Sequence, residues 1–250
     1  MKVTILGCGT SGGVPRIGPL WGDCDPNNPK NRRRRVSILV EQGDSTLLVD
    51  TSPDLREQLL DADVSRLDGV LWTHDHADHV HGIDDLRAIY HIMREPLQGY
   101  TDTRTLEVLK KRFDYIFKSQ LGYPAIVEPN IIDGPFRVGG IDVIPFVQEH
   151  GPITSLGFRF GNIAYSTDLN GIPDKAKEVL QDLDVWIVDA LRYKPHPTHP
   201  HLEMTLAWIE ELKPKRAILT HMTWDMDYDT LVKELPKGVE PGYDGLVINL

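Results

Sequence analysis

The chain has 250 residues, of which 40% are hydrophobic and 26% charged, and its formal net charge is −10 at pH 7. These values exclude a largely disordered chain and are typical of one globular domain, which we expect to span residues 1–250. The negative charge argues against a general nucleic-acid-binding surface, because such a surface needs broad positive potential. Two cysteines are too few for a disulfide scaffold.

Short β-like stretches recur along the sequence, and helical stretches fall between several of them. Strands are predicted at residues 3–6, 37–40, 46–50, 69–72, 141–145, 157–160, 163–166, 185–188 and 217–219. Helices are predicted from Ser52 as N-cap with Pro53 at the first helical position, and at residues 103–117, 173–180, 203–212 and 229–235. Tight turns at residues 42–45 and 161–162 join neighbouring strands as hairpins. Hairpins combined with βα units predict an α/β (α+β) fold with mixed sheets and helices outside.

The beginning of the chain has neither a signal-peptide pattern nor a membrane anchor. Residues 1–6 lead into a glycine-rich turn before an apolar segment develops, and no later apolar run is long enough to span a bilayer. We therefore expect a cytoplasmic protein that makes no membrane contact.

The long segment at residues 12–35 contains four prolines and five arginines and is interpreted as an active-site loop. It ends in the basic run Lys30–Arg35, directly before a predicted strand. Two interpretations of this run stay open. It is a solvated strand entry, or its alternate arginines face one side and steer anions towards a site.

The densest group of chemically active side chains is His74-Asp75-His76-Ala77-Asp78-His79, directly after the predicted strand at residues 69–72. Imidazoles and carboxylates packed this closely can converge on one point when a strand ends in a turn. They are also donor types that bind zinc and similar divalent ions. The segment therefore predicts a metal site.

One segment cannot complete two metal sites, so further ligands must come from elsewhere. Three candidates each follow a β-like run: His150, Asp168 and His221. Ligands at several strand ends place the site along one edge of a sheet. Asp50 also ends a predicted strand, and we expect it to orient a ligand or cap a helix rather than bind metal.

The motif at residues 74–79, followed in order by these three candidates, resembles the ligand series of the metallo-β-lactamase superfamily. The resemblance implies a four-layer αββα sandwich, with the metals at the rim between its two sheets. It also implies two divalent metal ions per chain, zinc or manganese. By position, the first would be held by His74, His76 and His150, the second by Asp78, His79 and His221, and Asp168 would bridge them.

Residues 7–15, 82–87 and 238–245 are similar to the phosphoribosyl cyclic phosphate phosphodiesterases of the carbon–phosphorus lyase pathway. This narrower resemblance implies a small phosphodiester substrate, cyclic or nucleotide-like, that a metal-bound hydroxide cuts. Several of those proteins hold an extra structural zinc with N-terminal cysteines and a histidine after the last ligand. We expect that zinc to be absent here, because the loop offers only Cys24 and the residues 222–224 include no histidine.

A histidine-rich loop supplies the candidates for the substrate-facing side chain. The position of His199 resembles that of the substrate-facing histidine in these phosphodiesterases and in tRNase Z. The resemblance gives His199 the task of protonating or stabilising the departing oxygen, while Asp78 orients the hydroxide. His201 is a further substrate-binding candidate, and His196 competes with His199.

The opening run Gly7–Gly12 imitates a dinucleotide-binding fingerprint, because its glycines follow a strand. Pro15 stands where that motif needs a helix, so the dinucleotide interpretation is not adopted. Thr10 and Ser11 in this run are instead candidates to contact a substrate phosphate.

The sequence thus favours a metal-dependent hydrolase of phosphoric diesters whose partner is a small substrate, and it leaves a homodimer open. A thioesterase resembling glyoxalase II, or a lactonase, is the leading alternative enzyme, since one fold hosts many reactions. A non-catalytic, metal-binding interaction module is the alternative from another class. A tRNA-processing nuclease is a further possibility, although no long basic arm is visible to grip RNA.

Overall fold

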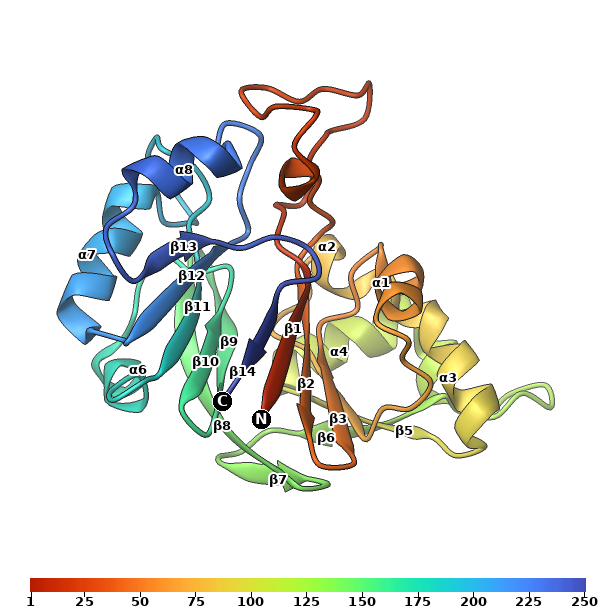
Figure 1. Ribbon diagram of the computed structural model, residues 1–250. Coiled ribbons are helices and arrows are strands. Elements are labelled where there is room, and N and C mark those ends of the chain that lie inside the picture. The colour runs from red at the N-terminus through yellow and green to blue at the C-terminus, as the bar shows by residue number, and fades with distance from the viewer.

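The computed structural model describes residues 1–250 and contains two sheets of seven strands each (Figure 1). One sheet consists of β1 (Lys2–Gly7), β2 (Ser37–Gln42), β3 (Ser45–Val49), β4 (Gly69–Leu71), β5 (Leu97–Thr101), β6 (Val127–Ile131) and β14 (Val247–Asn249). The other consists of β7 (Phe136–Val138), β8 (Ile141–His150), β9 (Ile153–Phe160), β10 (Ile163–Ser166), β11 (Val185–Asp189), β12 (Arg216–Thr220) and β13 (Val239–Pro241). The strand orders are β14-β1-β2-β3-β4-β5-β6 and β13-β12-β11-β10-β9-β8-β7.

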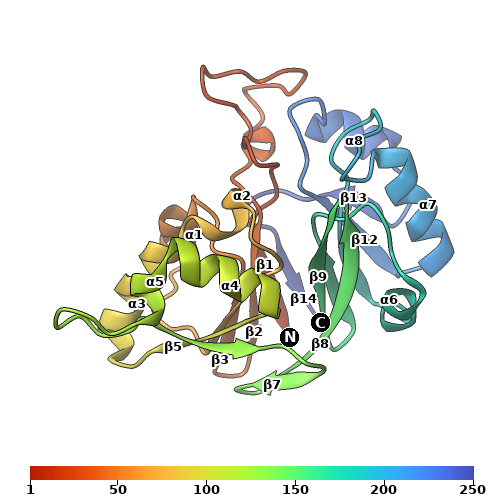
Figure 2. The same ribbon diagram turned by 180° about the vertical axis from the view of Figure 1, so that it is seen from behind.

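Helices cover the outer faces of both sheets, as Figures 1 and 2 show from opposite sides. Beside the first sheet lie α1 (Leu55–Asp61), α2 (Ala77–Val80), α3 (Leu86–Met93), α4 (Thr103–Arg112) and α5 (Asp114–Phe117), with the 3₁₀ helix η2 (Ile83–Asp85). Beside the second lie α6 (Asp174–Val179), α7 (Leu202–Leu212) and α8 (Tyr228–Glu234). The expected αββα layers with mixed sheets are confirmed.

The alternation of side chains along each strand explains why the sheets pack in this way. In β2, Ile38 and Val40 belong to a core of 35 buried residues that draws on both sheets. Leu39, between them, belongs to a separate core of 17 buried residues that packs with α1 and α3. Successive side chains of a strand point to opposite faces, so β2 contributes to both cores.

Most expected elements are present, with shifted ends. The hairpins β2–β3 and β9–β10 pair as expected. Helix α1 begins at Leu55 rather than at Pro53, because the Ser52 hydroxyl accepts the backbone N–H of Asp54 in a turn before the helix. The single helix expected at residues 103–117 breaks at Phe113, whose backbone leaves the helical region.

Strand directions bring several strand ends to the same rim. β10, β11 and β12 are parallel neighbours, and β9 runs antiparallel to both β8 and β10. β3 and β4 are also parallel to each other. The carboxyl ends of β8, β10, β11 and β12 therefore share one edge of their sheet.

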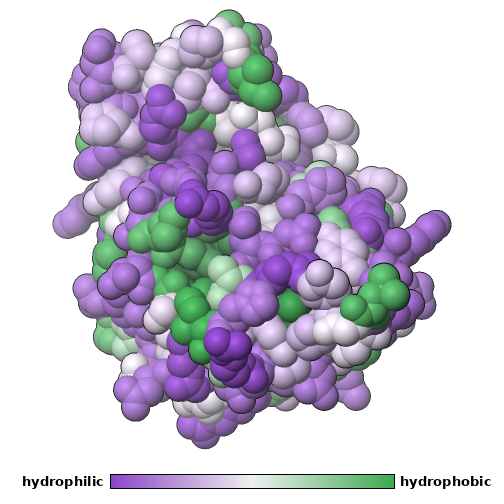
Figure 3. Space-filling model, turned by 90° about the vertical axis from the view of Figure 1, so that its right-hand side faces the viewer, coloured by the Kyte–Doolittle hydropathy of each residue, from purple (hydrophilic) through white to green (hydrophobic).

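The segment between β1 and β2 projects beyond the strand ends and contains the 3₁₀ helix η1 (Pro29–Asn31) (Figures 1 and 2). One face of the molecule is largely hydrophilic, with its main hydrophobic patch to the left of the centre and smaller ones at the top and near the right edge (Figure 3). None of the helices combines the length and the apolar character needed to traverse a lipid bilayer.

Candidate metal centre

Histidine and aspartate side chains converge where strands of both sheets end. His150 is the last residue of β8, Asp168 follows β10, and His221 follows β12. From the first sheet, His74 lies in the turn after β4, and the short helix α2 carries Asp78 and His79. Each of these segments leaves its strand at the rim, so residues far apart in sequence meet there.

Three residues at this rim have an unusual backbone conformation. Asp50, Asp168 and His221 have φ values of 63°, 52° and 57°, in the left-handed region that side chains other than glycine rarely adopt. Each follows directly or closely on a strand, so the left-handed residue turns the chain sharply. Such conformations cost about 1–3 kcal/mol each and gather at functional sites.

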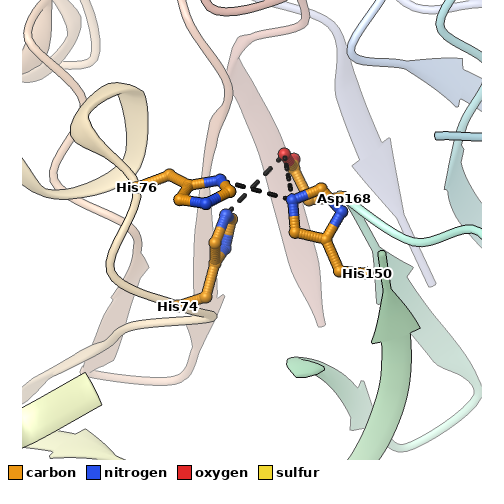
Figure 4. A group of neighbouring side chains, drawn as sticks. All are labelled: His74, His76, His150 and Asp168. Atoms are coloured by element: carbon orange, nitrogen blue, oxygen red, sulfur yellow. Dashed lines mark hydrogen bonds and ion pairs between the residues drawn. The ribbon is translucent and has the colours of Figure 1, made fainter. Parts of the chain in front are cut away.

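The first cluster is formed by His74, His76, His150 and Asp168 (Figure 4). Its donor atoms lie within 4.8 Å of one another. Nε2 of His150 lies 3.3 Å from Nδ1 of His76, and Nδ1 of His150 lies 2.8 Å from the carbonyl oxygen of Thr198. The Thr198 contact fixes the ring and leaves Nε2 directed at the cluster.

The second cluster is formed by Asp78, His79, Asp168 and His221, again with donor atoms within 4.8 Å of one another. Nε2 of His79 and Nε2 of His221 lie 3.5 Å and 3.6 Å from Oδ2 of Asp78. Asp75, within the same sequence motif, belongs to neither cluster and forms an ion pair with Arg104 at 2.9 Å.

Asp168 belongs to both clusters and presents one oxygen to each. Its Oδ2 lies 3.8 Å from Nε2 of His74 and 3.8 Å from Nε2 of His150. Its Oδ1 lies 3.1 Å from Nε2 of His79 and 3.4 Å from Nε2 of His221. A carboxylate so placed is able to bridge two cations.

In the two clusters, burial and neighbouring charges shift the pKa values of the side chains in opposite directions. Burial lowers the pKa of His74 well below its ordinary value and lowers that of His150 to about 4. Burial also acts against the charged form of His221, but Asp168 and Asp189 outweigh it and raise the His221 pKa to about 9. Burial would raise the pKa of Asp168, yet His221 and His79 hold it well below the usual carboxyl range. The buried carboxylates thus favour bound positive charge.

Asp50 lies behind the second cluster. Its Oδ2 is 2.7 Å from Nδ1 of His79, and its Oδ1 accepts the backbone N–H of Thr73 at 2.8 Å. With Nδ1 occupied, His79 directs Nε2 towards Asp168. This is the carboxylate–histidine arrangement that commonly orients a metal ligand.

Asp189, at the end of β11, is a site residue that the sequence analysis missed. Its Oδ2 lies 2.9 Å from Nδ1 of His199 and accepts the backbone N–H of Asp168 at 3.1 Å. It is fully buried, and burial raises its pKa. The criterion applied to Asp168 and His221, a polar residue that ends a β-like run, also fits Asp189 and would have found it.

Of the three histidines in the loop, His199 lies at the clusters. Its ring stacks on His221 with centroids 4.8 Å apart, and its Nε2 lies 3.7 Å from Oδ2 of Asp168. His196 belongs to neither cluster and contacts His199 instead, with ring centroids 5.2 Å apart. His201 is the N-cap residue of α7, near Glu203, and belongs to none of the clusters.

The glycine-rich loop after β1 reaches the segment that follows His221. The backbone N–H of Thr10 donates to the carbonyl of Met222 at 3.2 Å, so this amide is not free for a phosphate. The amides of Cys8 and Gly9 are also occupied, by Asp244 and by the carbonyl of Arg34. Ser11 is exposed at the turn, and its contact with a substrate stays a prediction.

The residues of the basic run before β2 have different surroundings: Arg32 is exposed, and both interpretations stay predictions for it, whereas Arg33, Arg34 and Arg35 are held by other parts of the chain. Arg34 and Arg35 form ion pairs with Asp61 at 2.7 Å and Asp54 at 3.0 Å. Arg33 is 2% exposed and donates from Nη2 to the carbonyl of Met226 at 2.6 Å and from Nη1 to that of Thr223 at 3.2 Å. These three arginines fasten the projecting segment to the body of the protein.

Comparisons with known proteins agree with this fold. Residues 45–222 match the family described as beta-lactamase superfamily domain. A solved structure described as a new diphosphatase from the PhnP family has a TM-score of 0.92 and 37% identity, and the match covers 100% of this chain and 97% of that one. The chain therefore belongs to the metallo-β-lactamase superfamily. Within it, the chain belongs to the PhnP family, the group that the sequence resembles.

Curated relatives are longer proteins. A protein named octanoyltransferase from Porphyromonas gingivalis (strain ATCC BAA-308 / W83) is 33% identical over 98% of this chain and 51% of its own length. A ribonuclease Z from Bradyrhizobium sp. (strain ORS 278) is 27% identical over 53% of this chain and 46% of its own length. The chain spans about half the length of the curated relatives it matches. The superfamily's fold and the His/Asp clusters imply divalent metal ions at this site.

Proposed function

We propose that the chain hydrolyses small phosphodiesters or diphosphates with two divalent metal ions, zinc or manganese. The observation that carries the proposal is the position of Asp168, which offers one oxygen to each of two histidine clusters. A shared carboxylate between two such clusters supports a dinuclear centre rather than one closed structural site.

The donor set fits such metals. Nε2 of His74, His79 and His221 is buried in each case without a hydrogen-bond partner. An unpaired buried polar atom costs free energy, and three of them aimed at shared carboxylates fit cation ligands. By the positions that the resemblance implies, the ligands would be His74, His76 and His150 on one side and Asp78, His79 and His221 on the other, with Asp168 between.

When bound, two divalent ions supply Lewis acidity and activate water as a nucleophile near neutral pH. The other tasks belong to the chain's own residues. Asp189 fixes Nδ1 of His199 as a donor, which leaves Nε2 on the side of Asp168. His199 would hold the proton that the departing oxygen needs, and Asp78 would orient the attacking water.

Names of relatives support phosphate chemistry over ester or thioester chemistry. The PhnP-family structure is called a diphosphatase, and the Bradyrhizobium relative is called ribonuclease Z. Octanoyl transfer is not proposed for this chain. Covalent acyl transfer needs an activated nucleophile, and burial raises the pKa of both cysteines, Cys8 and Cys24.

A small substrate is favoured over RNA, because the net charge of −10 repels an extended polyanion. Thioester and lactone substrates remain the alternatives to be tested. The single domain, the cytoplasmic location and the oligomeric state stay predictions.

The test begins with protein stripped by a chelator and reloaded with Mn²⁺ or Zn²⁺. Bis(p-nitrophenyl) phosphate and S-lactoylglutathione are assayed in parallel. We expect metal-dependent release of p-nitrophenol and little thioester cleavage. The reverse preference would assign the chain to the thioesterases, and metal binding without any hydrolysis would favour an interaction module.

Two variants separate metal binding from proton transfer. Asp168→Ala should lose metal, measured by elemental analysis, together with activity. His199→Ala should keep metal while kcat falls by about a hundredfold, the typical effect of removing a positioned acid. Asp184→Asn is the matched control, because Asp184 is a partly exposed carboxylate. It precedes β11, at the end of that strand opposite to the site. Full metal occupancy in Asp168→Ala would contradict the bridging role.

A further inference from the structure

Asp168 serves both clusters only while its carboxylate keeps one orientation. Its Oδ2 faces the first cluster, as Figure 4 shows for His74 and His150, and its Oδ1 faces the second. Rotation of the carboxylate about the Cβ–Cγ bond would turn both oxygens away from their clusters. The groups that prevent this rotation therefore shape the whole centre, although they lie outside it.

The backbone of Asp168 is held on both sides by buried side chains. Its N–H donates to Oδ2 of Asp189 at 3.1 Å, and its carbonyl oxygen accepts the Ser155 hydroxyl at 2.7 Å. Asp168 has a φ of 52°, a conformation that residues other than glycine rarely adopt. Because local preference does not favour this turn, the surrounding hydrogen bonds must hold it.

The carboxylate of Asp168 is held by its neighbour Thr167. The Thr167 hydroxyl donates to Oδ1 of Asp168 at 2.7 Å, in a charge-assisted hydrogen bond. This is the oxygen that lies 3.1 Å from Nε2 of His79 and 3.4 Å from Nε2 of His221. The hydroxyl therefore fixes which oxygen is turned towards the second cluster and leaves Oδ2 for the first.

Gln148, on β8, joins Ser155 and Thr167 to each other. Its Nε2 donates to the Ser155 hydroxyl at 3.1 Å and to the carbonyl of Thr167 at 3.1 Å. The Ser155 hydroxyl has a single proton, which it gives to Asp168, so towards Gln148 it can only accept. The Thr167 carbonyl likewise can only accept. Both protons of the amide are therefore used, and they fix the side chain of Gln148 in one orientation.

This network is costly for a protein interior, which indicates a task beyond packing. Gln148, Ser155 and Thr167 are fully buried, and Oε1 of Gln148 accepts no hydrogen bond within the chain. A buried acceptor without a donor destabilises the folded state, whereas an apolar side chain of the same size would not. Gly157 leaves the space for this amide, because a Cβ atom there would overlap the Phe146 ring and lie 2.9 Å from Oε1.

We infer that Gln148, Ser155 and Thr167 are positioning residues that set the carboxylate of Asp168 for two divalent ions. This role rests on the proposed dinuclear centre. It gives β8 two tasks, because His150 and Gln148 lie two residues apart and so point to the same face of the strand. His150 would bind metal directly, while Gln148 acts on the metals only through Asp168. Side chains that orient a metal ligand typically contribute about tenfold to a hundredfold to metal affinity.

The test titrates Mn²⁺ into chelator-stripped protein and follows binding by isothermal titration calorimetry. Gln148→Met keeps the approximate volume of the side chain but removes both donors, together with the unmatched Oε1. These two changes offset each other in the metal-free protein, so its Tm should change little, whereas Mn²⁺ should bind about tenfold to a hundredfold more weakly. Ser155→Ala removes the donor to the Asp168 carbonyl and should weaken Mn²⁺ binding by a similar factor.

Ser166→Ala is the matched control. Ser166 is an equally buried serine on β10, and its hydroxyl accepts the indole N–H of Trp186 at 3.0 Å, outside the network. Its replacement should leave the affinity for Mn²⁺ near that of the wild type. EPR spectra of protein loaded with Mn²⁺ and freed of excess ion give a second readout, since a bridging carboxylate couples the two ions. Gln148→Met and Ser155→Ala should show more of the signal of isolated Mn²⁺, which a loss of packing alone would not produce.

Mn²⁺ binding is measured without substrate, so the positioning role and the hydrolytic activity can fail separately. If no phosphodiester is cleaved but Gln148→Met and Ser155→Ala bind Mn²⁺ more weakly than the wild type and Ser166→Ala, the proposed hydrolysis fails and the positioning role stands. Equal affinities in all these proteins would overturn the inference. An equal loss in Ser166→Ala would overturn it too, because the effect would then be common to buried polar side chains in general.

Discussion

Replacing Asp189 by asparagine removes a fully buried negative charge while the size of the side chain is kept. The substitution weakens the 2.9 Å hydrogen bond between His199 Nδ1 and Asp189 Oδ2. A hydrogen bond to a charged group contributes about 1.5–3 kcal/mol. We therefore expect kcat for phosphodiester hydrolysis to fall by about tenfold to a hundredfold, because His199 loses the group that fixes its orientation.

Metal content should change little in this variant. Nδ1 of His221 lies 3.8 Å from the same oxygen, beyond hydrogen-bond distance, so this ligand loses only a weaker electrostatic interaction. The backbone N–H of Asp168 donates to the same oxygen at 3.1 Å, and the side-chain oxygen of asparagine can still accept it. The assay is steady-state kinetics with elemental analysis of each preparation, and Asp184→Asn, directly before the same strand, is the control. An unchanged kcat would refute the orienting role. Loss of metal with normal activity per bound ion would show instead that Asp189 acts as a ligand.

Three further predictions concern stability. Arg33→Met leaves the carbonyl of Met226 without its donor and removes one of the two donors to the carbonyl of Thr223, so the free energy of unfolding in urea should fall by about 2–4 kcal/mol. An unchanged urea midpoint would show that Arg33 does not hold these two carbonyls together. Burial raises the pKa of Asp244 to about 7, although backbone N–H groups of Arg34 and Cys8 favour its charged form. The folded chain then binds this proton more tightly than the unfolded chain, so stability falls as pH rises from about 4 to about 7, by about 2 kcal/mol for a partly shielded carboxyl. Urea titrations of metal-free protein should show a smaller fall in the free energy of unfolding in Asp244→Asn than in the wild type. If the two proteins lose stability equally between pH 4 and pH 7, Asp244 is not the cause. Removing metal with a chelator should lower Tm, and added Mn²⁺ should restore it, because a thousandfold excess over Kd raises the free energy of unfolding by about 4 kcal/mol. A Tm independent of metal would argue against ions at the buried carboxylates.

The sequence determined the chemical character of the site and much of the local structure. His74, His76 and His79 occur within six residues after a strand, and this pattern is local enough to be recognised without coordinates. His150, Asp168 and His221 could be selected because each follows a β-like run. Short continuous hydrophobic runs likewise marked most of the strands, since a strand buried on both faces of its sheet is hydrophobic at successive positions.

Only the tertiary structure decided which groups meet. It placed Asp189 against His199, turned Arg33 from a member of a basic run into a buried clamp, and brought Gln148 against Thr167. The short strands β5, β6, β7, β13 and β14 also escaped the sequence pattern, because three to five residues carry little periodicity. The physical reason is the same in each case. A residue type and its immediate neighbours encode which contacts are chemically feasible, whereas the partner is chosen by strand pairings and loop packing between segments that lie far apart in the chain.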